Sequence, residues 1–584
     1  MKNIISFKKN EYTINNYKFI LDWQNEVLTE YKTFQYLKNN PKYLPLPYLA
    51  YPWAFLIDIY NNKYKLFYSS FYNFVNSLNL LENLNDSESY ITTIQSYHFK
   101  KYLHCFKKMG IKYIFSPHII EKEFFDIFDS YNIIIFPYLI YPSIQGPILN
   151  KNIFYSFIGN INYKLERPTK IRSELCSMKH TKDCLVKSLD SWHFDEAVYG
   201  EQLNLIKFKN DFNIDKIKRE EEYRNILGSS LFSLCPLGIG PNSIRLWESF
   251  KYSSIPVVIS DNLWLPFYIN VNWNDLLIQI KENSLNKLTD LYHINDKEMY
   301  QDKIKIFSEK YLQDENFGNL IHEAFPEEKK FILLICWFNI TDENRLNEIN
   351  TCLEKNLSNV LIKKIILFYE CDDLNKIKEI NHQKITIVPF ISNRKRDVSF
   401  NFIVDYANKH FLNQFCIISN NDIYFDETLN ETNKLNFEKN NYFVALTRKN
   451  CGKYLNNKNK IWEPHSASQD SWIFKTPIKK MNDDIKLGWI QCDNIIASNY
   501  SDLNYNVINP FYSINCWHLH KFNNTDMLLS NFNYNYRYKM KKVQLESIET
   551  IINKKNIILD DLTLVGKINV KKLSNIKKNF KLKK

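Results

Sequence analysis

The stretch from Ser233 to Glu248 reads SLCPLGIGPNSIRLWE, in which an apolar run leads into two glycines and then into a helix-like pattern. The apolar run is typical of a buried strand, and Gly238 and Gly240 permit a tight turn after it. Asn242 or Ser243 can cap the helix that follows. The stretch therefore predicts a strand, a turn and a helix, which together form the local unit of a parallel α/β fold.

The junction between this strand and this helix suits an anionic ligand, because free backbone N–H groups and the positive helix end meet there. Arg245 and Glu248 are three residues apart and share one helix face. A guanidinium can clamp phosphate oxygens and a carboxylate can accept ribose hydroxyls, so the pair predicts a nucleotide-sugar site. The alternative is a surface ion pair, which Arg/Glu pairs at this spacing form more often.

Short apolar runs alternate with helix-like segments on both sides of the junction, which predicts parallel α/β layers. Strands are predicted at 90–97, 111–115, 132–140, 153–158, 231–235, 255–260, 331–336, 364–369, 385–389, 414–419 and 442–446. The pattern restarts after the charged segment 326–330, which predicts a domain boundary. The predicted domains are 1–150, 151–327, 328–535 and a basic tail at 536–584.

Composition narrows the class of protein. A chain of 584 residues is too long for one core. Its net charge of +12 is spread along the chain, and no nucleic-acid-binding module is recognisable. The basic tail can touch acidic lipid or stay solvated. The 11 cysteines form no C-x-x-C pair, which favours reduced thiols and a cytoplasmic location. The apolar runs are shorter than a membrane span, so none is expected.

The wider string from Tyr223 to Phe267, including SSLFSLCP, NSIRLWE and IPVVISD, resembles the exostosin family, glycosyltransferase family 47. The upstream FIGN at 157–160, with Arg167 and Arg172 after it, is similar to the segment that opens that family's donor lobe. The resemblance covers about residues 85–320. It implies a GT-B fold of two Rossmann-like lobes, with 1–150 on the acceptor side and 151–327 binding the donor. It also implies a nucleotide-diphospho-sugar donor, typically a UDP-sugar, and no bound metal.

By this resemblance, Arg245 binds the diphosphate and Glu248 binds the ribose. The remaining residues expected at the donor are Arg167, Arg172, Gly238, Gly240, Asn242 and Ser243. The segment 251–254 departs from the family's usual small residues. His118 follows a predicted strand and is a candidate for the acceptor-side base, with an ordinary structural histidine as the alternative.

A second set of polar residues follows the predicted strand that ends near Ser419. Carboxylates at such a strand end hold Mg²⁺ or Mn²⁺ against a diphosphate in transferases of the GT-A fold. Here Asn420 stands where the first aspartate of a D-x-D motif is expected, so Asp422 is the charged ligand candidate. Asp426 lies four residues further on. The alternative is a capped strand end followed by a turn.

Together with SQDSWIF at 468–474, LGWIQCDN at 487–494 and HLH at 518–520, this segment resembles a GT-A-like domain of microbial and algal polysaccharide glycosyltransferases, over about 330–525. That resemblance implies a divalent cation, Mn²⁺ or Mg²⁺, held by Asp422 with His518 or His520. It further implies Asp493 as catalytic base, with Asp470 as a second base or an acceptor ligand. Arg394 and Arg396 either touch the donor or are solvated charges.

These patterns predict a bifunctional glycosyltransferase that moves sugars from nucleotide-diphospho-sugar donors to a growing glycan. An exostosin-like module followed by a GT-A module is also the order found in animal exostosins, although the D-D-D signature of their second module is missing here. One alternative is a single active module with the other degenerate, and Asn420 points to the C-terminal one. Another is a non-catalytic sugar- or nucleotide-binding scaffold in polysaccharide assembly.

Overall fold

In a computed structural model, the chain folds into two compact units, Met1–Glu327 and Glu328–Lys584. The structure describes residues 4–552 except for 15–16, 25–26, 43, 86–87, 145, 162–169, 190–211, 239, 270, 326–328, 375–379, 393–396, 452–467, 488–491 and 520–542. Both units are α/β with largely parallel sheets, as the sequence predicts. Among the described residues, no helix combines the length and the apolar character needed to cross a membrane.

The first sheet of the N-terminal unit has the strand order β1-β4-β5-β6-β7, and its neighbouring strands are parallel. Its strands are β1 (Ile4–Ser6), β4 (Tyr48–Ala50), β5 (Tyr90–Thr93), β6 (Ile111–Ser116) and β7 (Ile134–Pro137). Its helices are α1 (Thr29–Asn39), α2 (Trp53–Ile59), α3 (Phe71–Ser77), α4 (Leu103–Lys108) and α5 (Glu121–Tyr131). A hairpin, β2 (Glu11–Ile14) and β3 (Tyr17–Ile20), lies outside this sheet. The central strands are buried apolar runs, as expected for a sheet covered on both faces.

Two predicted strands of this sheet are shorter than their apolar runs. The run 90–97 leaves the sheet after Thr93, because Ser96 caps a 3-10 helix by accepting a hydrogen bond from the His98 backbone N–H at 3.3 Å. The run 132–140 begins with Asn132, whose φ of 57° places it in the left-handed region at the end of α5. Helix-capping residues therefore set where β5 ends and where β7 begins, although the apolar runs extend further.

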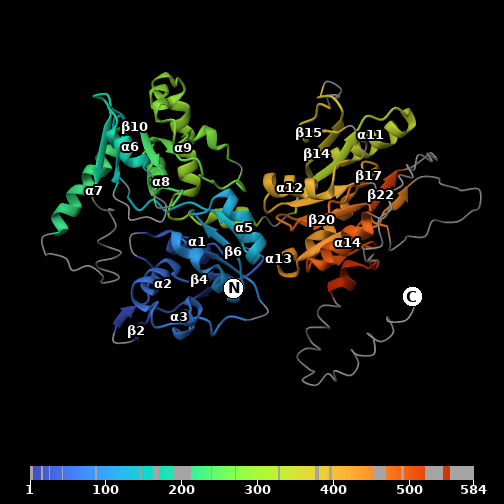
Figure 1. Ribbon diagram of the computed structural model, residues 1–584, viewed down its shortest axis with the longest axis horizontal. Helices are drawn as coiled ribbons and strands as arrows, with labels where there is room; N and C mark the ends of the chain where they lie inside the picture. The colour runs from blue at the N-terminus through green and yellow to red at the C-terminus, as the bar shows by residue number, and fades with distance from the viewer. Residues whose placement is uncertain are drawn as a thin grey trace, which may run out of the picture. The chain divides into compact units, whose positions relative to one another are not determined.

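The second sheet of the N-terminal unit has the order β12-β11-β10-β8-β9, again with parallel neighbours. Its strands are β8 (Ile153–Asn160), β9 (Leu185–Leu189), β10 (Ser230–Pro236), β11 (Ile255–Ile259) and β12 (Ile278–Ile280). Its helices are α6 (Ile171–Ser177), α7 (Phe212–Ser229), α8 (Ile244–Lys251) and α9 (Lys297–Tyr311), whereas α10 (Asn319–Ala324) contacts α1 of the first half. Figure 1 shows α6, α8 and α9 gathered near β10. The strand, turn and helix predicted for 233–248 are thus present as β10 and α8.

Side-chain hydrogen bonds join later segments of the N-terminal unit to elements of its first half. The Tyr268 hydroxyl donates to the carbonyl of Pro137, the last residue of β7, at 3.0 Å. The Tyr36 hydroxyl of α1 donates to the Asn319 side chain of α10 at 3.1 Å. The Tyr268 contact lies at the carboxyl end of β7, and parallel α/β sheets bind ligands outside the carboxyl ends of their strands.

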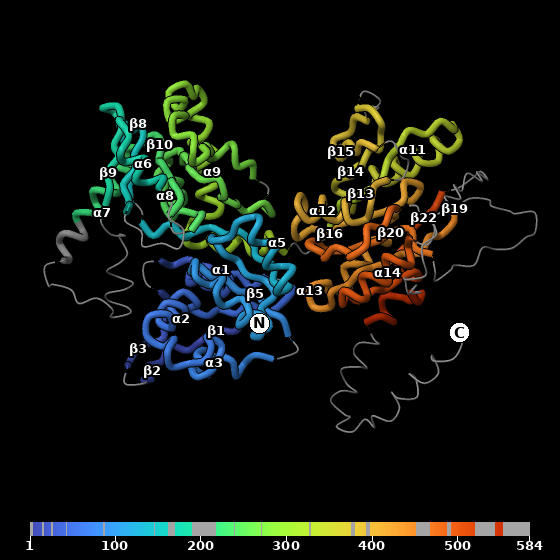
Figure 2. Tube along the Cα trace, in the orientation of Figure 1, coloured from blue at the N-terminus to red at the C-terminus, as the bar shows by residue number. Residues whose placement is uncertain are grey.

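The C-terminal unit is built on a seven-stranded sheet of order β15-β14-β13-β16-β20-β18-β21. Its strands are β13 (Phe331–Phe338), β14 (Ile362–Cys371), β15 (Ile385–Ile391), β16 (Phe415–Ser419), β18 (Tyr442–Leu446), β20 (Ser471–Lys475) and β21 (Asn506–Ile508). Figure 2 shows β13, β14 and β15 as neighbours in this sheet. A smaller sheet holds β17 (Ile423–Phe425), β22 (Cys516–Leu519) and β19 (Lys449–Cys451). In this otherwise parallel sheet, β20, which is not among the predicted strands, runs antiparallel to both β16 and β18.

Side chains of β13 alternate between two cores, one on each face of the large sheet. Leu333 packs with residues of α11 (Glu343–Ser358) on one face. Leu334 packs with residues of α12 (Phe400–His410) and α14 (Cys492–Asp502) on the other. Successive residues of a strand point to opposite faces, so a continuous apolar run serves both cores.

A buried carboxyl pair makes the stability of the N-terminal unit depend on pH. Glu30 accepts hydrogen bonds from the backbone N–H groups of Gln95 at 3.0 Å and Ala54 at 3.2 Å. Asp58 accepts from the Gln24 side chain at 2.8 Å. Burial raises the pKa of Glu30 from 4.5 to about 8 and that of Asp58 to about 7. The folded unit therefore keeps protons that the unfolded chain has lost, and its free energy of unfolding falls as pH rises from about 4.5 to 8.

We expect Glu30→Gln to flatten this pH dependence by about 2–4 kcal/mol, because glutamine does not ionise and retains an oxygen for both backbone donors. Hydrogen exchange of peptides containing Ala54 and Gln95 at pH 5 and pH 8, corrected for intrinsic exchange, reports on this unit alone. An unchanged pH dependence in the variant would exclude Glu30 as the titrating group.

Candidate functional site

In the N-terminal unit, the candidate donor site lies where β10 gives way to α8. Ser243 is the N-cap residue of α8, with extended backbone angles and no side-chain capping bond. Asn242, the other predicted cap, has a different role. Its side chain accepts a hydrogen bond from the Trp247 ring N–H at 3.0 Å and donates one to the Tyr138 carbonyl at 3.4 Å. Asn242 thus anchors the start of α8 to the segment that follows β7.

Arg245 and Glu248 are both buried, with 8% and 0% of the residue surface exposed, so they are not the surface ion pair of the alternative. The Arg245 guanidinium lies 5.2 Å from the ring centre of Phe157 and 5.0 Å from that of Tyr223. The faces of both aromatic rings attract the guanidinium cation and hold this planar group in place. The two aromatic residues come from β8 and α7, so three elements orient this one side chain.

Glu248 has one satisfied and one unsatisfied oxygen. Its Oε2 accepts a hydrogen bond of 2.6 Å from the Tyr223 hydroxyl. Its Oε1 is buried and has no hydrogen-bond partner in the part of the chain that the structure describes. Burial raises the pKa of Glu248 to about 7, against the opposing effects of Tyr223 and Arg245. A buried acceptor without a partner is costly, and hydroxyl groups of a ligand can supply the missing donors.

Arg172 is used differently from the predicted phosphate ligand. It donates to the backbone carbonyls of Leu237 at 2.9 Å, Pro236 at 3.2 Å and Asn160 at 3.2 Å. Burial and the nearby Arg245 charge lower its pKa to about 9. The side chain therefore ties the ends of β8 and β10 together beneath the glycine turn. Arg167, predicted beside it, lies outside the described residues.

Gly238 and Gly240 lie in the turn between β10 and α8. Gly240 is approached closely by His118, which follows β6 of the first sheet. A Cβ atom on Gly240 would lie 2.2 Å from His118 Nδ1, so a larger residue does not fit. The sequence treats the glycine and the histidine as separate features, whereas the fold brings them into contact.

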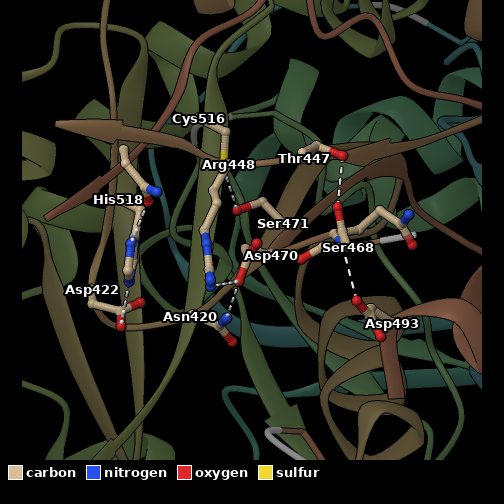
Figure 3. Close-up of polar contacts among 12 residues, drawn as sticks. Asn420, Asp422, Thr447, Arg448, Ser468, Asp470, Ser471, Asp493, Cys516 and His518 are labelled. Carbon is tan, nitrogen blue, oxygen red and sulfur yellow. Dashed lines mark hydrogen bonds and ion pairs between the residues drawn. The ribbon is translucent and has the colours of Figure 1, made fainter. Parts of the chain in front are cut away.

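In the C-terminal unit, two strand pairings assemble the second candidate site. Pairing of β17 with β22 sets Ile423 opposite His518, which brings His518 beside Asp422. The His518 Nε2 atom lies 3.2 Å from Asp422 Oδ2, and its Nδ1 lies 3.0 Å from the Asn450 side-chain oxygen. Pairing of β16 with β20 sets Ser419 opposite Ser471 and so places Asn420 beside Asp470. Figure 3 shows Asp422 beside His518 and Asn420 beside Asp470.

Asp422 is a buried anion held by cationic neighbours. It forms an ion pair with the guanidinium of Arg345, from α11, in addition to its contact with His518. Burial acts to raise the pKa of Asp422, but His518 and Arg345 outweigh it and hold the pKa well below its ordinary value. Its Oδ1 is buried and has no hydrogen-bond partner among the described residues.

Asp470 and Asp493 lie beside this pair and have distinct environments. Asp470 Oδ1 accepts from the Arg448 guanidinium at 3.1 Å and from the Asn420 amide at 3.0 Å. Asp493, in the first turn of α14, accepts at 3.1 Å from the backbone N–H of Gln469. Burial raises the pKa of both carboxyl groups. Of the two, Asp493 is the less buried.

The remaining predicted residues of this site divide into two groups. Asp426 points away from it, because its carboxylate accepts from the Asn515 amide at 2.8 Å and the Trp517 ring N–H at 2.7 Å. His520, Arg394 and Arg396 lie outside the described residues. Within the described segments, no group of three or more His, Cys, Asp or Glu side chains is arranged to hold a metal ion.

Sequence reasoning assigned no role to four residues that shape these sites: Tyr223, Arg345, Arg448 and Asn450. Tyr223 belongs to the string that carries the exostosin resemblance, so its presence there was the available clue. The other three are held in place by contacts with residues distant in the chain. No local pattern distinguishes them from ordinary polar residues.

Comparisons with known proteins concern mainly the N-terminal unit. Residues 131–294 match the model of the exostosin GT47 domain. A probable glucuronosyltransferase of Oryza sativa subsp. japonica is 44% identical over 126 residues, which are 21% of this chain and 29% of that protein. A probable glucuronoxylan glucuronosyltransferase of Arabidopsis thaliana, IRX7, is 41% identical over 69 residues, covering 12% and 15%. The exostosin-1 homolog of Caenorhabditis elegans is 32% identical over 94 residues, covering 15% and 25%.

The chain thus spans less than a third of the length of each of these relatives. A crystal structure of TarM aligns with 42% of this chain and 53% of its own at 12% identity, with a TM-score of 0.26 that is too low to bear on the fold. The segment 131–294 is of the exostosin GT47 type, and the enzyme class that these matches indicate is a glycosyltransferase.

Proposed function

We propose that the chain is a bifunctional glycosyltransferase, with one active site in each unit and nucleotide-diphospho-sugars, UDP-sugars above all, as donors to a growing glycan. The observation that carries the proposal is the buried Glu248, whose Oε1 has no hydrogen-bond partner among the described residues, on the same helix as the buried Arg245 in the segment that matches the exostosin GT47 domain. In this proposal the N-terminal unit is a GT-B pair of lobes and the C-terminal unit is a GT-A domain.

In the first transfer, catalysed by the N-terminal unit, Glu248 accepts the ribose hydroxyls and Arg245 binds the diphosphate. The backbone N–H groups at the start of α8 and the turn with Gly238 and Gly240 add polar contacts to the phosphates. Arg172 supports these groups by binding the carbonyls at the ends of β8 and β10. Ser243 is the N-cap residue of α8. No metal is proposed for this unit, because the guanidinium and the helix end already supply positive charge to the leaving diphosphate.

In the second transfer, catalysed by the C-terminal unit, Asp422 and His518 would hold a divalent cation together with the donor. The unpartnered Asp422 Oδ1 is a free oxygen ligand, and His518 presents a nitrogen beside it. Mg²⁺ and Mn²⁺ are commonly bound by one or two protein groups plus substrate phosphates, so two side chains suffice. When bound, the cation offsets the charge of the diphosphate. We retain His520 as a third candidate ligand.

Asp493 is the proposed base of the second transfer and Asp470 the second candidate. Asp493 lies at the start of α14, is partly accessible, and has a pKa raised by burial, as a base that works near neutral pH requires. Asp470 is fixed by Arg448 and Asn420, which suits an orienting role toward the acceptor.

A single active module is the second candidate function, and one observation favours it. Asn420 replaces an expected aspartate, and the Arg345 guanidinium already neutralises Asp422. In that case the C-terminal unit binds the acceptor without transferring sugar.

The test of function is a nucleotide-release screen with UDP-, GDP-, CMP- and dTDP-sugars, with and without Mn²⁺ and mixed acceptor glycans. Two donors, of which only one depends on the metal, are the expected result. Release from a single donor would indicate that one unit only binds the acceptor. No release from any donor would favour a non-catalytic binding scaffold. The described cysteines are free thiols, which supports a cytoplasmic location as part of the proposal.

A further inference from the structure

His118 lies just after the carboxyl end of β6 in the first sheet and contacts the turn before α8. It follows β6, and its backbone N–H donates to the Ser116 side chain at 3.3 Å, which shapes the turn. The ring then packs against Gly240, where an added Cβ would lie 2.2 Å from Nδ1 and 2.8 Å from Cε1. A side chain from the first sheet thus lies directly on the turn that we assign to the donor diphosphate.

The contacts of His118 are not those of a satisfied structural histidine. Its Nδ1 atom is buried and has no hydrogen-bond partner in the described parts of the chain. The ring instead meets the Tyr97 ring edge-on, with 6.1 Å between centres. A buried ring nitrogen without a partner lacks the hydrogen bond that such groups almost always make, so a ligand group is the natural partner.

The surroundings of His118 keep the imidazole neutral. Burial lowers its pKa to about 3, and the charges of Lys100 and His98, both on the 3-10 helix Tyr97–Tyr102, add to the effect. The neutral imidazole has a lone pair for a proton, but a pKa of about 3 makes it a weak base in the protein without donor. A bound diphosphate would bring negative charge to the same turn and so raise the proton affinity of the ring at the moment when the donor is present.

We propose that His118 is the general base of the first transfer, an inference that rests on the proposed function. The acceptor oxygen forms a bond to the anomeric carbon of the donor while the bond from that carbon to the diphosphate oxygen breaks. The diphosphate leaves with the electron pair, and the proton of the acceptor hydroxyl passes to the imidazole. The proton thereby moves to His118, which follows a strand of the first sheet. The leaving diphosphate stays at the β10–α8 turn of the second sheet.

The test compares His118→Gln with His104→Gln in the full-length protein. His104 is exposed on α4 and its ring contacts only Cys105 among the described side chains, which makes it a matched control. We expect kcat of the first transfer, with the donor found in the screen, to fall at least about 100-fold in His118→Gln. The dissociation constant of UDP should stay within about threefold, and His104→Gln should change neither value.

Chemical rescue separates a base from a positioning role. Added imidazole should restore part of the activity of His118→Ala, because the small base can enter the space that the side chain leaves. A kcat within about threefold of wild type in both His118 variants, or a loss of UDP affinity that accounts for the whole loss of rate, would overturn the inference. A wild-type protein that releases no nucleotide would instead overturn the proposed function on which the inference rests.

Discussion

Glu248→Ala is expected to abolish the first transfer and to leave the second transfer intact. In the proposed site, the buried Glu248 carboxyl offers its Oε1 to the ribose hydroxyls and is partly ionised at neutral pH, because burial raises its pKa to about 7. Hydrogen bonds to a charged group contribute about 1.5–3 kcal/mol each, so loss of two predicts a fall in kcat/KM of about 10³-fold. The nucleotide-release assay, run with each donor in turn, measures both activities in one sample.

Two further variants make the Glu248 result interpretable. Glu248→Gln keeps an acceptor for the Tyr223 hydroxyl, so it separates loss of charge from loss of local structure. Glu222→Ala removes an exposed carboxylate of α7 that pairs with Lys187 at 2.8 Å, and should change activity less than twofold. Loss of both transfers in Glu248→Ala would contradict two independent active sites.

Asp422→Asn is expected to silence the second transfer alone, by about 10³-fold. The change removes the charged oxygen ligand but preserves the shape of the side chain. Arg345 keeps a carboxylate partner in Glu348 at 2.9 Å, so the substitution does not leave that guanidinium without an ion pair. Removal of metal by a chelator should have the same effect on the second transfer, and none on the first.

Electron paramagnetic resonance can measure the binding of Mn²⁺ in the presence of UDP, and this measurement does not depend on turnover. Wild type should bind one ion that Asp422→Asn does not. Asp405→Asn, which removes an exposed carboxylate paired with Lys480 at 3.1 Å, is the matched control. A second transfer that survives chelation would show the metal assignment to be wrong, and would leave the Arg345 guanidinium as the cation at Asp422.

Most strands of the large sheets could be predicted from their apolar runs, since a strand buried on both faces is recognisable without knowledge of its neighbours. The short strands β1 and β4 escaped prediction because their runs are only three residues long. The strand β20 also escaped prediction, and so did its antiparallel direction. Whether a strand runs parallel or antiparallel depends on the path of the chain between strands, which hydrophobic periodicity does not encode.

The sites divide in the same way between local pattern and long-range contact. Arg245 and Glu248 lie on one short helix directly after a strand, so their spacing alone placed them together and at the helix start. The contact between Asp422 and His518 joins residues 96 positions apart, and that between Asn420 and Asp470 joins residues 50 apart. The first arises from the pairing of β17 with β22, the second from that of β16 with β20.

The sequence alone established the strand, turn and helix around residue 240, the residue types suited to a nucleotide sugar, and the restart of the pattern near residue 328. Local backbone preferences and the periodicity of burial act over a few residues and can be read directly. Tertiary structure was needed to bury Glu248 beside Tyr223, to turn Arg172 onto the backbone, and to set His118 against Gly240. Those arrangements depend on how separate elements pack, because burial and hydrogen-bond partners are properties of the assembled core and not of any one segment.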